Sequence, residues 1–430
     1  MPASPLILIR AGAVLDAADV SARPGALAVR DGHIVAAGGE SDVRRQAGAP
    51  DRVVELPDRL LMPAMVNAHA HLDLTDIERQ PYQGEFIGWI ESVIRQRPRE
   101  EAAISRAVRR GLELSKDAGV VAVGDIAGSP AAARARIFAK PALWLAGTSW
   151  LECFGIGRAG RDAARGAWTM QMALLQEQTK ASLPRTVKIG LQPHAPYSAG
   201  AEVYSFANDP WFGIPSTHLA ETPEEAMFVR AATGPFADLL KRLGKWDETI
   251  QPAGVSPIAH FVTSLAQEQS CEPWVLAHCN YTSDTDLDLL RQTRHSIAYC
   301  PLASDYFGHR NHRYRDMLAA GINVCLGTDS IICQPAHEPQ PLGILPQMRH
   351  LYRRDRTDPR TLLKMATMNG ATALGLGHDQ QGTLAAGQLA ALMHAKFDPS
   401  NELDPLEQVL RHDEVAKPIE IAQDQDADQR

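Results

Sequence analysis

Cysteine is scarce in this 430-residue chain, and long apolar runs are missing. The six cysteines are scattered and include no Cys-x-x-Cys pair, a pattern that fits reduced, buried thiols and argues against a disulfide framework. No uninterrupted apolar stretch approaches the roughly 20 residues of a membrane helix. The short apolar run over residues 5–9 lacks the basic lead and the length of a signal peptide. We therefore expect a cytoplasmic protein with no membrane partner.

An excess of positive charge is also missing. The chain has 43 lysine and arginine residues against 51 aspartate and glutamate residues, for a net charge of −8. This balance argues against nucleic acid as a partner. A hydrophobic content of 45% with 22% charged residues is typical of a globular protein, and the length predicts one large domain plus a smaller one. We expect the partner to be a small molecule.

Residues 1–60 read as short strands joined by tight turns. The expected strands cover residues 6–9, 26–30, 33–37 and 52–56, and Asp31-Gly32 is a strong hairpin signal between two of them. No helical periodicity is evident before Met62. We interpret this segment as the N-terminal part of a small β domain.

Residues 61–373 alternate apolar strands with longer amphipathic segments. We predict eight strands, over residues 60–67, 119–123, 142–147, 187–192, 213–217, 274–277, 296–300 and 323–327. Helices are expected between several of them, over residues 100–118, 163–181, 224–230, 284–291 and 313–320. Eight such units predict an α/β fold of the (β/α)8 TIM-barrel type. An open dinucleotide-binding sheet is disfavoured, because no Gly-x-Gly-x-x-Gly follows the first strand.

Residues 374–430 return to a glycine-punctuated β pattern with a further strand expected over residues 392–397, followed by an acidic tail. We expect this C-terminal part to join the first 60 residues. The predicted architecture is thus a TIM barrel with a small β-sandwich domain built from both chain ends.

Histidines and an aspartate stand at the ends of the predicted strands. His69 and His71 close the first strand, and side chains at i and i+2 of a strand point to the same side. His194, His218, His278 and Asp329 close the fourth, fifth, sixth and eighth strands. The functional residues of barrel enzymes lie at the C-terminal ends of strands. A single such histidine is more often a core residue than a ligand, but the whole set predicts a metal site.

The chemistry of such a site can be assigned by residue type. His69, His71, His218 and Asp329 are the predicted ligands of one divalent ion that keeps a position open for water. A bound cation lowers the pKa of that water toward neutrality, which makes hydroxide available for attack. Imidazole suits zinc and iron alike. We expect zinc, with iron as the alternative.

Three side chains are predicted to act in catalysis. Asp329 can also take a proton from the water, and Glu221 can carry that proton to the substrate. His278 would contact the water or the developing oxyanion. The ordinary alternative for Glu221 is an acidic residue that opens the following helix.

At these residues the chain resembles the amidohydrolase superfamily. The matching motifs are Asn67-Ala-His-Ala-His-Leu, Pro193-His-Ala-Pro-Tyr, His218-Leu-Ala-Glu, Ala277-His-Cys and Gly327-Thr-Asp-Ser. Members with two metals carry a carboxylated lysine at the end of the fourth strand. Here the only lysine of that strand, Lys188, stands near its start. The resemblance therefore implies a site with one metal, as in the deaminase branch.

Within that branch the chain is similar to the S-adenosylhomocysteine/methylthioadenosine deaminases and the aminodeoxyfutalosine deaminases. The resemblance implies substrate contacts from the loop after the fourth strand and from aromatic side chains after the first. The candidates for substrate binding are Phe86, Trp89, Glu152, His194, Tyr197, Ser304 and Ser330. The stretch from Cys300 to Asp305 departs from the pattern of the branch, with Leu302 where arginine is common, which leaves the identity of the substrate open.

The sequence thus predicts a metal-dependent hydrolytic deaminase of an adenosine-type nucleoside or a related amino-N-heterocycle, releasing ammonia. One alternative is removal of chloride or an alkylamine from a triazine-like ring, and another is deamination of guanine, cytosine or a pterin. A non-catalytic binding protein with the same fold would be expected to have lost a ligand, and none is lost. His309 and His312 are expected in a solvated basic loop, and a homodimer is an expectation taken from the family.

Overall fold

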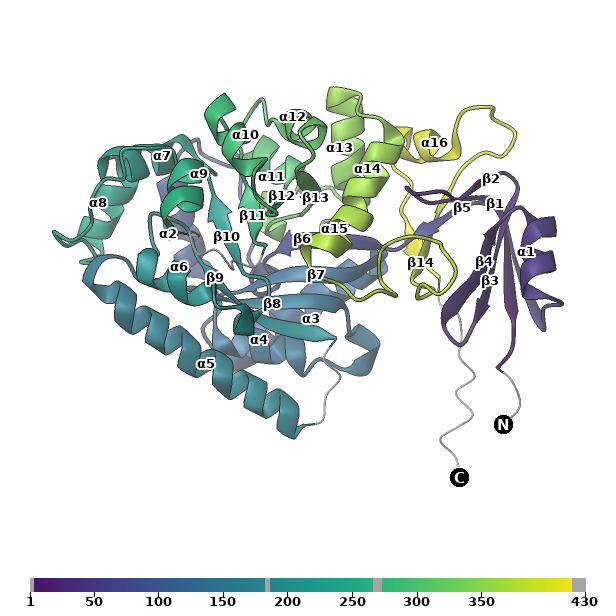
Figure 1. Ribbon diagram of the computed structural model, residues 1–430, viewed down its shortest axis with the longest axis horizontal. Helices are drawn as coiled ribbons and strands as arrows, with labels where there is room; N and C mark the ends of the chain where they lie inside the picture. Colours follow the sequence, from purple (N-terminus) through teal and green to yellow (C-terminus); the bar gives the residue numbers. More distant parts are fainter. Residues whose placement is uncertain (1–3, 182–185, 266–272, 420–430) are drawn as a thin grey trace.

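The computed structural model describes residues 4–181, 186–265 and 273–419, which form two parallel sheets and one mixed sheet (Figure 1). The parallel sheets and their helices make up the larger part of the molecule, and the mixed sheet lies at one end of it (Figure 1). Within the described residues, no helix has both the length and the apolar composition needed to cross a bilayer. Five cysteines lie in this part of the chain, and all five are buried and free, as predicted.

The mixed sheet is built from both ends of the chain, in the order β15-β14-β5-β1-β3-β4 with β2 paired to β1. Its strands are β1 (Ile7–Leu15), β2 (Ser21–Ala22), β3 (Gly25–Arg30), β4 (His33–Gly38), β5 (Arg52–Pro63), β14 (Leu392–Lys396) and β15 (Lys417–Pro418). The late strand β14 runs antiparallel to β5, with Met393 opposite Met62. The predicted hairpin at Asp31-Gly32 is confirmed: both residues have positive φ, and Arg30 pairs with His33 across the turn.

One helix stands in this region, where the sequence predicted none. α1 (Glu40–Ala47) is eight residues long and buries only Val43, so it has no apolar periodicity to detect. Val43 packs against Leu8 and Ala28 of the sheet. The helix forms because this contact with the sheet outweighs a weak local preference.

The eight predicted strands of the larger part are present. The first sheet has the order β6-β7-β8-β9 and the second the order β10-β11-β12-β13, and every pairing is parallel. The strands are β6 (Met65–Ala70), β7 (Val120–Ala127), β8 (Ala146–Cys153), β9 (Val187–Pro193), β10 (Ser216–Leu219), β11 (Val275–His278), β12 (Ser296–Tyr299) and β13 (Asn323–Leu326).

Three strand predictions were displaced. The strand expected over residues 213–217 starts late, as β10, because Pro210–Phe212 forms a 3-10 turn. The strand expected over residues 60–67 straddles the end of β5 and the start of β6, because the chain leaves the mixed sheet near Pro63. The strand expected over residues 142–147 starts late, because Pro141–Leu143 forms a 3-10 turn. The apolar runs were recognised. Their composition does not show where the chain leaves one sheet and enters another.

The two parallel sheets adjoin at both edges. At one seam the backbone N–H of His218, in β10, donates to the carbonyl oxygen of His194 over 3.0 Å. At the other seam the N–H groups of Thr328 and Asp329 both donate to the carbonyl oxygen of His69, each over 3.0 Å. Both seams therefore lie at strand ends that carry predicted site residues.

An apolar layer fills the space among the strands below these ends. It joins Val66, Ala122, Trp150, Val275 and Cys325, each from a different strand, with residues of α15. Helices pack around the strands (Figure 1), and the five predicted helices are confirmed as α3, α5, α7, α10 and α12. The helices are α2 (Phe86–Gln96), α3 (Glu101–Asp117), α4 (Pro130–Ile137), α5 (Gly160–Lys180), α6 (Ala201–Ala207), α7 (Pro223–Ala231), α8 (Pro235–Arg242), α9 (Pro257–His260), α10 (Asp284–Leu290), α11 (Pro301–Tyr306), α12 (Tyr314–Ala319), α13 (Leu345–Asp355), α14 (Pro359–Ala366), α15 (Met368–Ala373) and α16 (Pro405–Arg411).

Candidate active site

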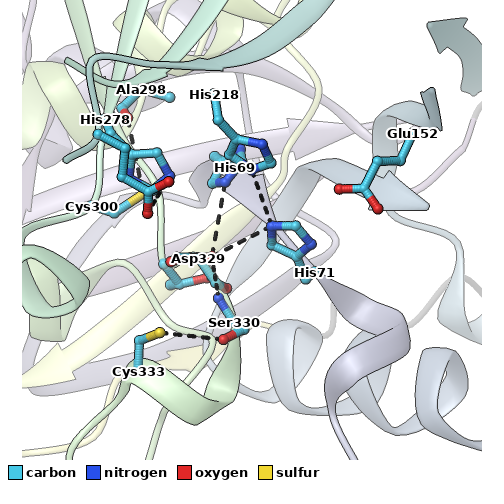
Figure 2. Close-up of polar contacts among 12 residues, drawn as sticks. His69, His71, Glu152, His218, His278, Ala298, Cys300, Asp329, Ser330 and Cys333 are labelled. Atoms are coloured by element: carbon cyan, nitrogen blue, oxygen red, sulfur yellow. Dashed lines mark hydrogen bonds and ion pairs between the residues drawn. The ribbon is translucent and has the colours of Figure 1, made fainter. Parts of the chain in front are cut away.

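Three histidines from β6, its C-terminal end and β10 meet above the apolar layer. The ring centroid of His69 lies 5.3 Å from that of His71 and 5.0 Å from that of His218. The Nε2 atoms of His71 and His218 are 3.3 Å apart, and their rings are stacked. Figure 2 shows the three imidazoles turned toward one another. One nitrogen from each lies within 4.8 Å of the others, a spacing that could hold a metal ion.

Asp329 adds a carboxylate to this group from the end of β13. Its Oδ1 lies 3.5 Å from Nε2 of His71 and 4.0 Å from Nε2 of His69 (Figure 2). The N–H of Ser330 donates to the same oxygen over 2.7 Å. Burial raises the pKa of Asp329 to about 6, and this hydrogen bond opposes the shift.

The four side chains fit a divalent cation. Burial, with the neighbouring histidines, lowers the pKa of His69 and of His71 well below the usual 6.5, so both are neutral. Nδ1 of His218 lies 3.0 Å from the carbonyl oxygen of His194, which fixes the proton there and leaves Nε2 as a free lone pair. Both ring nitrogens of His69 and Nδ1 of His71 are buried without a hydrogen-bond partner among the described residues. Buried lone pairs without donors are costly unless a cation accepts them.

Glu221 and His278 form a second pair beside Asp329. Oε1 of Glu221 lies 3.6 Å from Nε2 of His278, and one ligand atom from each of the three residues lies within 4.8 Å of the others. Burial, with the negative charges of Asp329 and Glu225, raises the pKa of Glu221 well above its usual range. Burial also lowers the pKa of His278 well below 6.5. A carboxyl group whose protonated form is favoured by burial thus faces a neutral imidazole.

The backbone around Glu221 is held by buried side chains that the sequence analysis missed. The carboxylate of Glu225, in α7, accepts the N–H of Ala220 over 2.9 Å and that of Glu221 over 2.8 Å. Asn280 donates to the carbonyl oxygen of Glu221 over 3.0 Å. Ser304 donates to Asn280 over 2.8 Å and is 2% exposed. Ser304 therefore lies behind the site and supports Asn280, and the surrounding cavity is lined by other residues.

The strand ends at the site have an unusual backbone. Ala220, His278, Cys279 and Asp329 all have positive φ, between 49° and 73°. They are half of the eight non-glycine residues with positive φ in the described chain. Left-handed backbone costs free energy for residues with a β carbon and concentrates at functional sites. Here it turns the chain so that the side chains of His278 and Asp329 enter the site.

A buried ion-pair network forms one wall of the site. Arg97 lies between two carboxylates, with Nη2 2.9 Å from Asp73 and Nη1 3.1 Å from Glu152. The guanidinium packs on Gly128, where a β carbon would lie 1.5 Å from Nη2. Burial alone would raise the pKa of Glu152, but Arg97 and His194 outweigh it and lower that pKa. Asp73 and Arg97 were missed, although Asp73 stands two residues after His71 in the first motif.

The cavity in front of these groups has a volume of about 130 Å³. Tyr197 stacks on Phe236 with centroids 3.6 Å apart, and Phe86 stacks on Trp89 at 5.7 Å. Its wall thus combines aromatic rings with the charged network, and contact with a substrate stays a prediction. The predicted substrate-binding residues that line it are Phe86, Trp89, Glu152, His194, Tyr197 and Ser330.

His309 and His312 were expected to be solvated, and this expectation is wrong. His309 is 9% exposed and lies 3.0 Å from the Tyr281 hydroxyl through its Nδ1. Nε2 of His312 lies 2.8 Å from the carbonyl oxygen of His278, and its ring stacks on Tyr299. His312 therefore supports the positive-φ turn at His278. Nothing in the local pattern of the loop marks this long-range contact.

The sequence pattern that defines the amidohydrolase family matches residues 60–419 of the chain. This match covers both parallel sheets, the site and the return of the chain to the mixed sheet. The protein therefore belongs to the amidohydrolase family, whose members use a divalent metal ion.

Curated relatives extend over most of the chain. An aminodeoxyfutalosine deaminase of Deinococcus radiodurans is 26% identical over 369 residues, which cover 82% of each chain. A 5-methylthioadenosine/S-adenosylhomocysteine deaminase of Pelotomaculum thermopropionicum is 26% identical over 443 residues, covering 98% of this chain and 90% of the relative.

Solved structures share the fold. Aminofutalosine deaminase of Helicobacter pylori, in complex with methylthio-coformycin, superposes with a TM-score of 0.77 at 20% identity and covers 96% of this chain and 97% of its own. Atrazine chlorohydrolase of Arthrobacter aurescens, in complex with zinc, has a TM-score of 0.73 at 19% identity and covers 95% and 92%. At this identity the likeness establishes the fold, in which strands and helices alternate as in a TIM barrel.

Proposed function

We propose that this protein is a metal-dependent aminohydrolase that removes the amino group of an adenosine-type nucleoside or a related N-heterocycle as ammonia. The observation that carries the proposal is the side-by-side arrangement of two groups. His69 and His71 have buried ring nitrogens without a partner, His218 and Asp329 lie against them, and Glu221 with His278 lies directly beside this group. The deaminase names of the relatives support the same chemistry.

His69, His71, His218 and Asp329 would hold one divalent ion, with zinc favoured and iron the alternative. When bound, the ion would supply an activated water for attack on the carbon that carries the amino group. Two of the solved structures with this fold contain zinc, which supports the choice of metal.

Glu221 and His278 would manage the proton and the developing charge. In the net reaction a C–O bond to water oxygen forms, the C–N bond breaks, and ammonia leaves. Glu221 would donate a proton to a ring nitrogen, which lets the ring accept electrons as the C–O bond forms, and its raised pKa favours the protonated form that this step needs. The neutral imidazole of His278 would contact the oxygen that is added. Asp329 would accept a proton from the attacking water and pass it to the amino group, which leaves as ammonia, while the added hydroxyl group would return a proton to Glu221.

The other wall of the cavity would bind the rest of the substrate. Phe86 and Trp89 offer aromatic faces to a heterocycle. Glu152, held as a carboxylate beside Arg97, offers acceptors for hydroxyl or amino donors such as those of a ribose. His194 and Tyr197 line the same cavity.

We further propose that the eight strands β6–β13 form a closed (β/α)8 barrel, supported by the hydrogen bonds at both seams. The proposed barrel domain covers residues 61–373, and residues 1–60 and 374–430 form the small β domain. Within the described residues that domain contains one mixed sheet, and its description as a sandwich stays a prediction. A homodimer also stays a prediction.

The proposal is tested by incubating metal-loaded protein with adenosine, S-adenosylhomocysteine, methylthioadenosine, aminodeoxyfutalosine, guanine, cytosine, a pterin and a chlorinated triazine. Ammonia and chloride are measured together. Ammonia from an adenosine derivative is the expected result. Chloride or alkylamine release without ammonia from any nucleoside would overturn the proposal in favour of the triazine alternative.

A further inference from the structure

Two acceptor atoms face each other at the wall of the cavity. Oε1 of Glu152, near the end of β8, lies 3.8 Å from Nε2 of His194, which follows β9. Both residues line the cavity. In Figure 2 the histidines proposed as metal ligands lie between Glu152 and His278. We call Glu152 with His194 the wall pair, and the four proposed ligands together the first site. The wall pair is thus distinct from the pair of Glu221 and His278.

The contacts of His194 leave a lone pair on Nε2. Nδ1 of its ring lies 2.6 Å from the hydroxyl oxygen of Ser198. That hydroxyl donates its own proton to the carbonyl oxygen of Ala195 over 3.2 Å, so Nδ1–H is the donor in the shorter contact. A neutral imidazole protonated at Nδ1 has its lone pair on Nε2. Because 3.8 Å is too long for a hydrogen bond to Glu152, Nε2 is a free acceptor at the cavity wall.

The carboxyl group of Glu152 uses one oxygen and leaves the other free. Arg97 donates to Oε2 over 3.1 Å, and no described residue donates a hydrogen bond to Oε1. The same guanidinium donates to Asp73, so its one positive charge is divided between two carboxyl groups. The side chain of Glu152 is 3% exposed and that of His194 is 18% exposed. Two largely buried acceptors that face each other are costly unless a cation or a donor lies between them.

We propose that the wall pair binds a second divalent ion of the zinc type, with lower affinity than the first site. Bonds of about 2.0–2.1 Å from zinc to nitrogen or oxygen span ligand atoms up to about 4.1 Å apart. The wall pair, at 3.8 Å, fits within this span. One ligand atom each from Glu152, His194 and His218 lie within 4.8 Å of one another. Imidazole with carboxylate favours zinc over magnesium, which prefers oxygen ligands.

The second ion is weaker because it has two protein ligands of its own. His218 lies near both groups, but its Nδ1 is 3.0 Å from the carbonyl oxygen of His194 and its Nε2 is 3.3 Å from Nε2 of His71. His218 therefore stays with the first site, and water completes the shell of the second ion. That ion covers the acceptors of Glu152 that the proposed function assigns to the substrate. Its binding therefore competes with binding of the substrate.

Zinc binding at equilibrium tests the second site directly. Chelator-treated protein is dialysed against rising concentrations of free zinc, and bound zinc is measured by elemental analysis. We expect one ion per chain at low zinc and a second at higher zinc. His194→Phe keeps an aromatic ring beside Phe154 and Tyr197 but removes Nε2. It should keep the first ion and bind the second about 10- to 100-fold more weakly, as for other losses at metal sites.

Two further proteins make this measurement specific. Glu152→Gln keeps an oxygen for Arg97 and places an NH₂ group where Oε1 was, so it should also lose the second ion. His33→Phe is the matched control, because His33 is exposed and lies in β4 of the mixed sheet. It should bind both ions as the wild type does. Retention of the first ion in each sample shows that the site is folded.

Three results of the dialysis would overturn the inference. They are a single bound zinc in the wild type at every concentration, a second ion of equal affinity in the wild type and both wall-pair variants, and loss of both ions together by both variants. The last result would show that the wall pair supports the first site and binds no ion of its own. Magnesium in place of zinc should add no second ion.

A kinetic test follows the competition, and it rests on the proposed function, whereas the dialysis does not. Free zinc at ten times the Kd of the second ion should raise KM for ammonia release about tenfold and leave kcat unchanged. In Glu152→Gln the same zinc should leave KM at that variant's own low-zinc value. An unchanged wild-type KM with the second ion bound would overturn the competition. If no compound is deaminated, the proposed function fails and the dialysis still decides the second site.

Discussion

The carboxyl group of Glu221 and the imidazole of His278 face each other at 3.6 Å, and both side chains are at least nine-tenths buried. Glu221→Gln keeps the size of this side chain but removes its transferable proton. We expect kcat to fall by roughly 10²- to 10⁴-fold, the usual contribution of a positioned proton carrier. Metal content should stay at the wild-type level, because Glu221 is not one of the four proposed ligands. Ammonia release and metal analysis on the same sample measure both.

A Glu221→Gln protein that kept most of its activity would exclude this proton route. A protein that lost both activity and metal would place Glu221 among the ligands.

Among the described residues, Arg97 is the cation that pairs with both Asp73 and Glu152 at the cavity wall. In Arg97→Met, two buried carboxylates lose their partner, and such a loss is strongly destabilising. In the double variant Arg97→Met/Glu152→Gln the charge of Glu152 is also removed, so only Asp73 is left without its partner. We therefore expect the two substitutions together to cost less than the sum of their separate costs, by about 1–3 kcal/mol. Urea unfolding of the four proteins measures this coupling.

Gly128→Ala provides a matched perturbation of the same network. An added β carbon would lie 1.5 Å from Nη2 of Arg97, so it displaces the guanidinium without removing any charge. We expect KM to rise in Gly128→Ala more than kcat falls, because Glu152 is the group that loses its fixed position. For the double variant Arg97→Met/Glu152→Gln, a loss in free energy of unfolding equal to the sum of the two single losses would show that Arg97 and Glu152 do not act as a pair.

At the scale of an element, α7 fixes the loop that carries Glu221. The helix begins at Pro223, its preceding Thr222 accepts the N–H of Glu225, and Glu225 in turn holds the N–H groups of Ala220 and Glu221. In Glu225→Gln the side-chain amide can accept only one of these donors and turns an NH₂ group toward the other. We expect kcat to fall about tenfold or more, with metal content retained. Kinetics and metal analysis check this.

Glu224→Gln is the control for that substitution. Glu224 is the preceding residue of the same helix and is only half-buried. The same loss of charge there should leave kcat near the wild-type value. If both variants lost activity equally, the charge of the helix and not the backbone contact of Glu225 would be responsible.

Elements with a strong local pattern could be predicted from the sequence. β7 and β9 are largely apolar, with Asp125 in β7 and Lys188 and Gln192 in β9 as exceptions, and α3 has apolar side chains at helical spacing over 17 residues. The residues proposed as metal ligands could also be predicted, because parallel strands bring the side chains at their carboxyl ends to the same edge of a sheet. His69, His71 and His218 do meet within 4.8 Å, and Asp329 lies 3.5 Å from His71.

Features that depend on distant contacts could not be predicted. α1 forms on the sheet through Val43 alone, and His312 supports His278 across 34 positions of sequence. Arg97 stands at the end of α2, where a basic residue usually signals only a helix end. Its two carboxylate partners come from other elements. A single sequence contains no record of such pairings, since each partner is ordinary in its own neighbourhood.

At the scale of the whole molecule, the proposed metal ligands come from both parallel sheets. His69 and His71 come from the first sheet and its end, His218 comes from the second, and Asp329 follows the last strand. A bound ion therefore stabilises the junction of the sheets as well as the site. We expect removal of the metal to lower the free energy of unfolding by about 2.7 kcal/mol at a metal concentration of 100 times Kd. Thermal unfolding with and without a chelator measures the loss.

Two variants make this prediction specific. Asp329→Asn removes a proposed ligand and should lose most of the stabilisation by metal. Glu221→Gln, which changes a neighbouring carboxyl group outside the proposed ligand set, should keep it. Equal stabilisation by metal in both variants would show that the ion binds elsewhere.

The pairing of β14 with β5 has a consequence for how the protein is made. A ribosome releases β5 when residue 63 has emerged, but its partner begins only at Leu392. At a synthesis rate of about 5–20 residues per second, the edge of β5 that later pairs with β14 stays unpaired for on the order of tens of seconds. Of the residues of β5 that later pair with β14, Arg59 is charged, and Asp58 precedes it; charged side chains discourage an open strand from pairing with other nascent chains. Charge at the unpaired end of β5 thus lowers the risk of wrong pairing before β14 is synthesised.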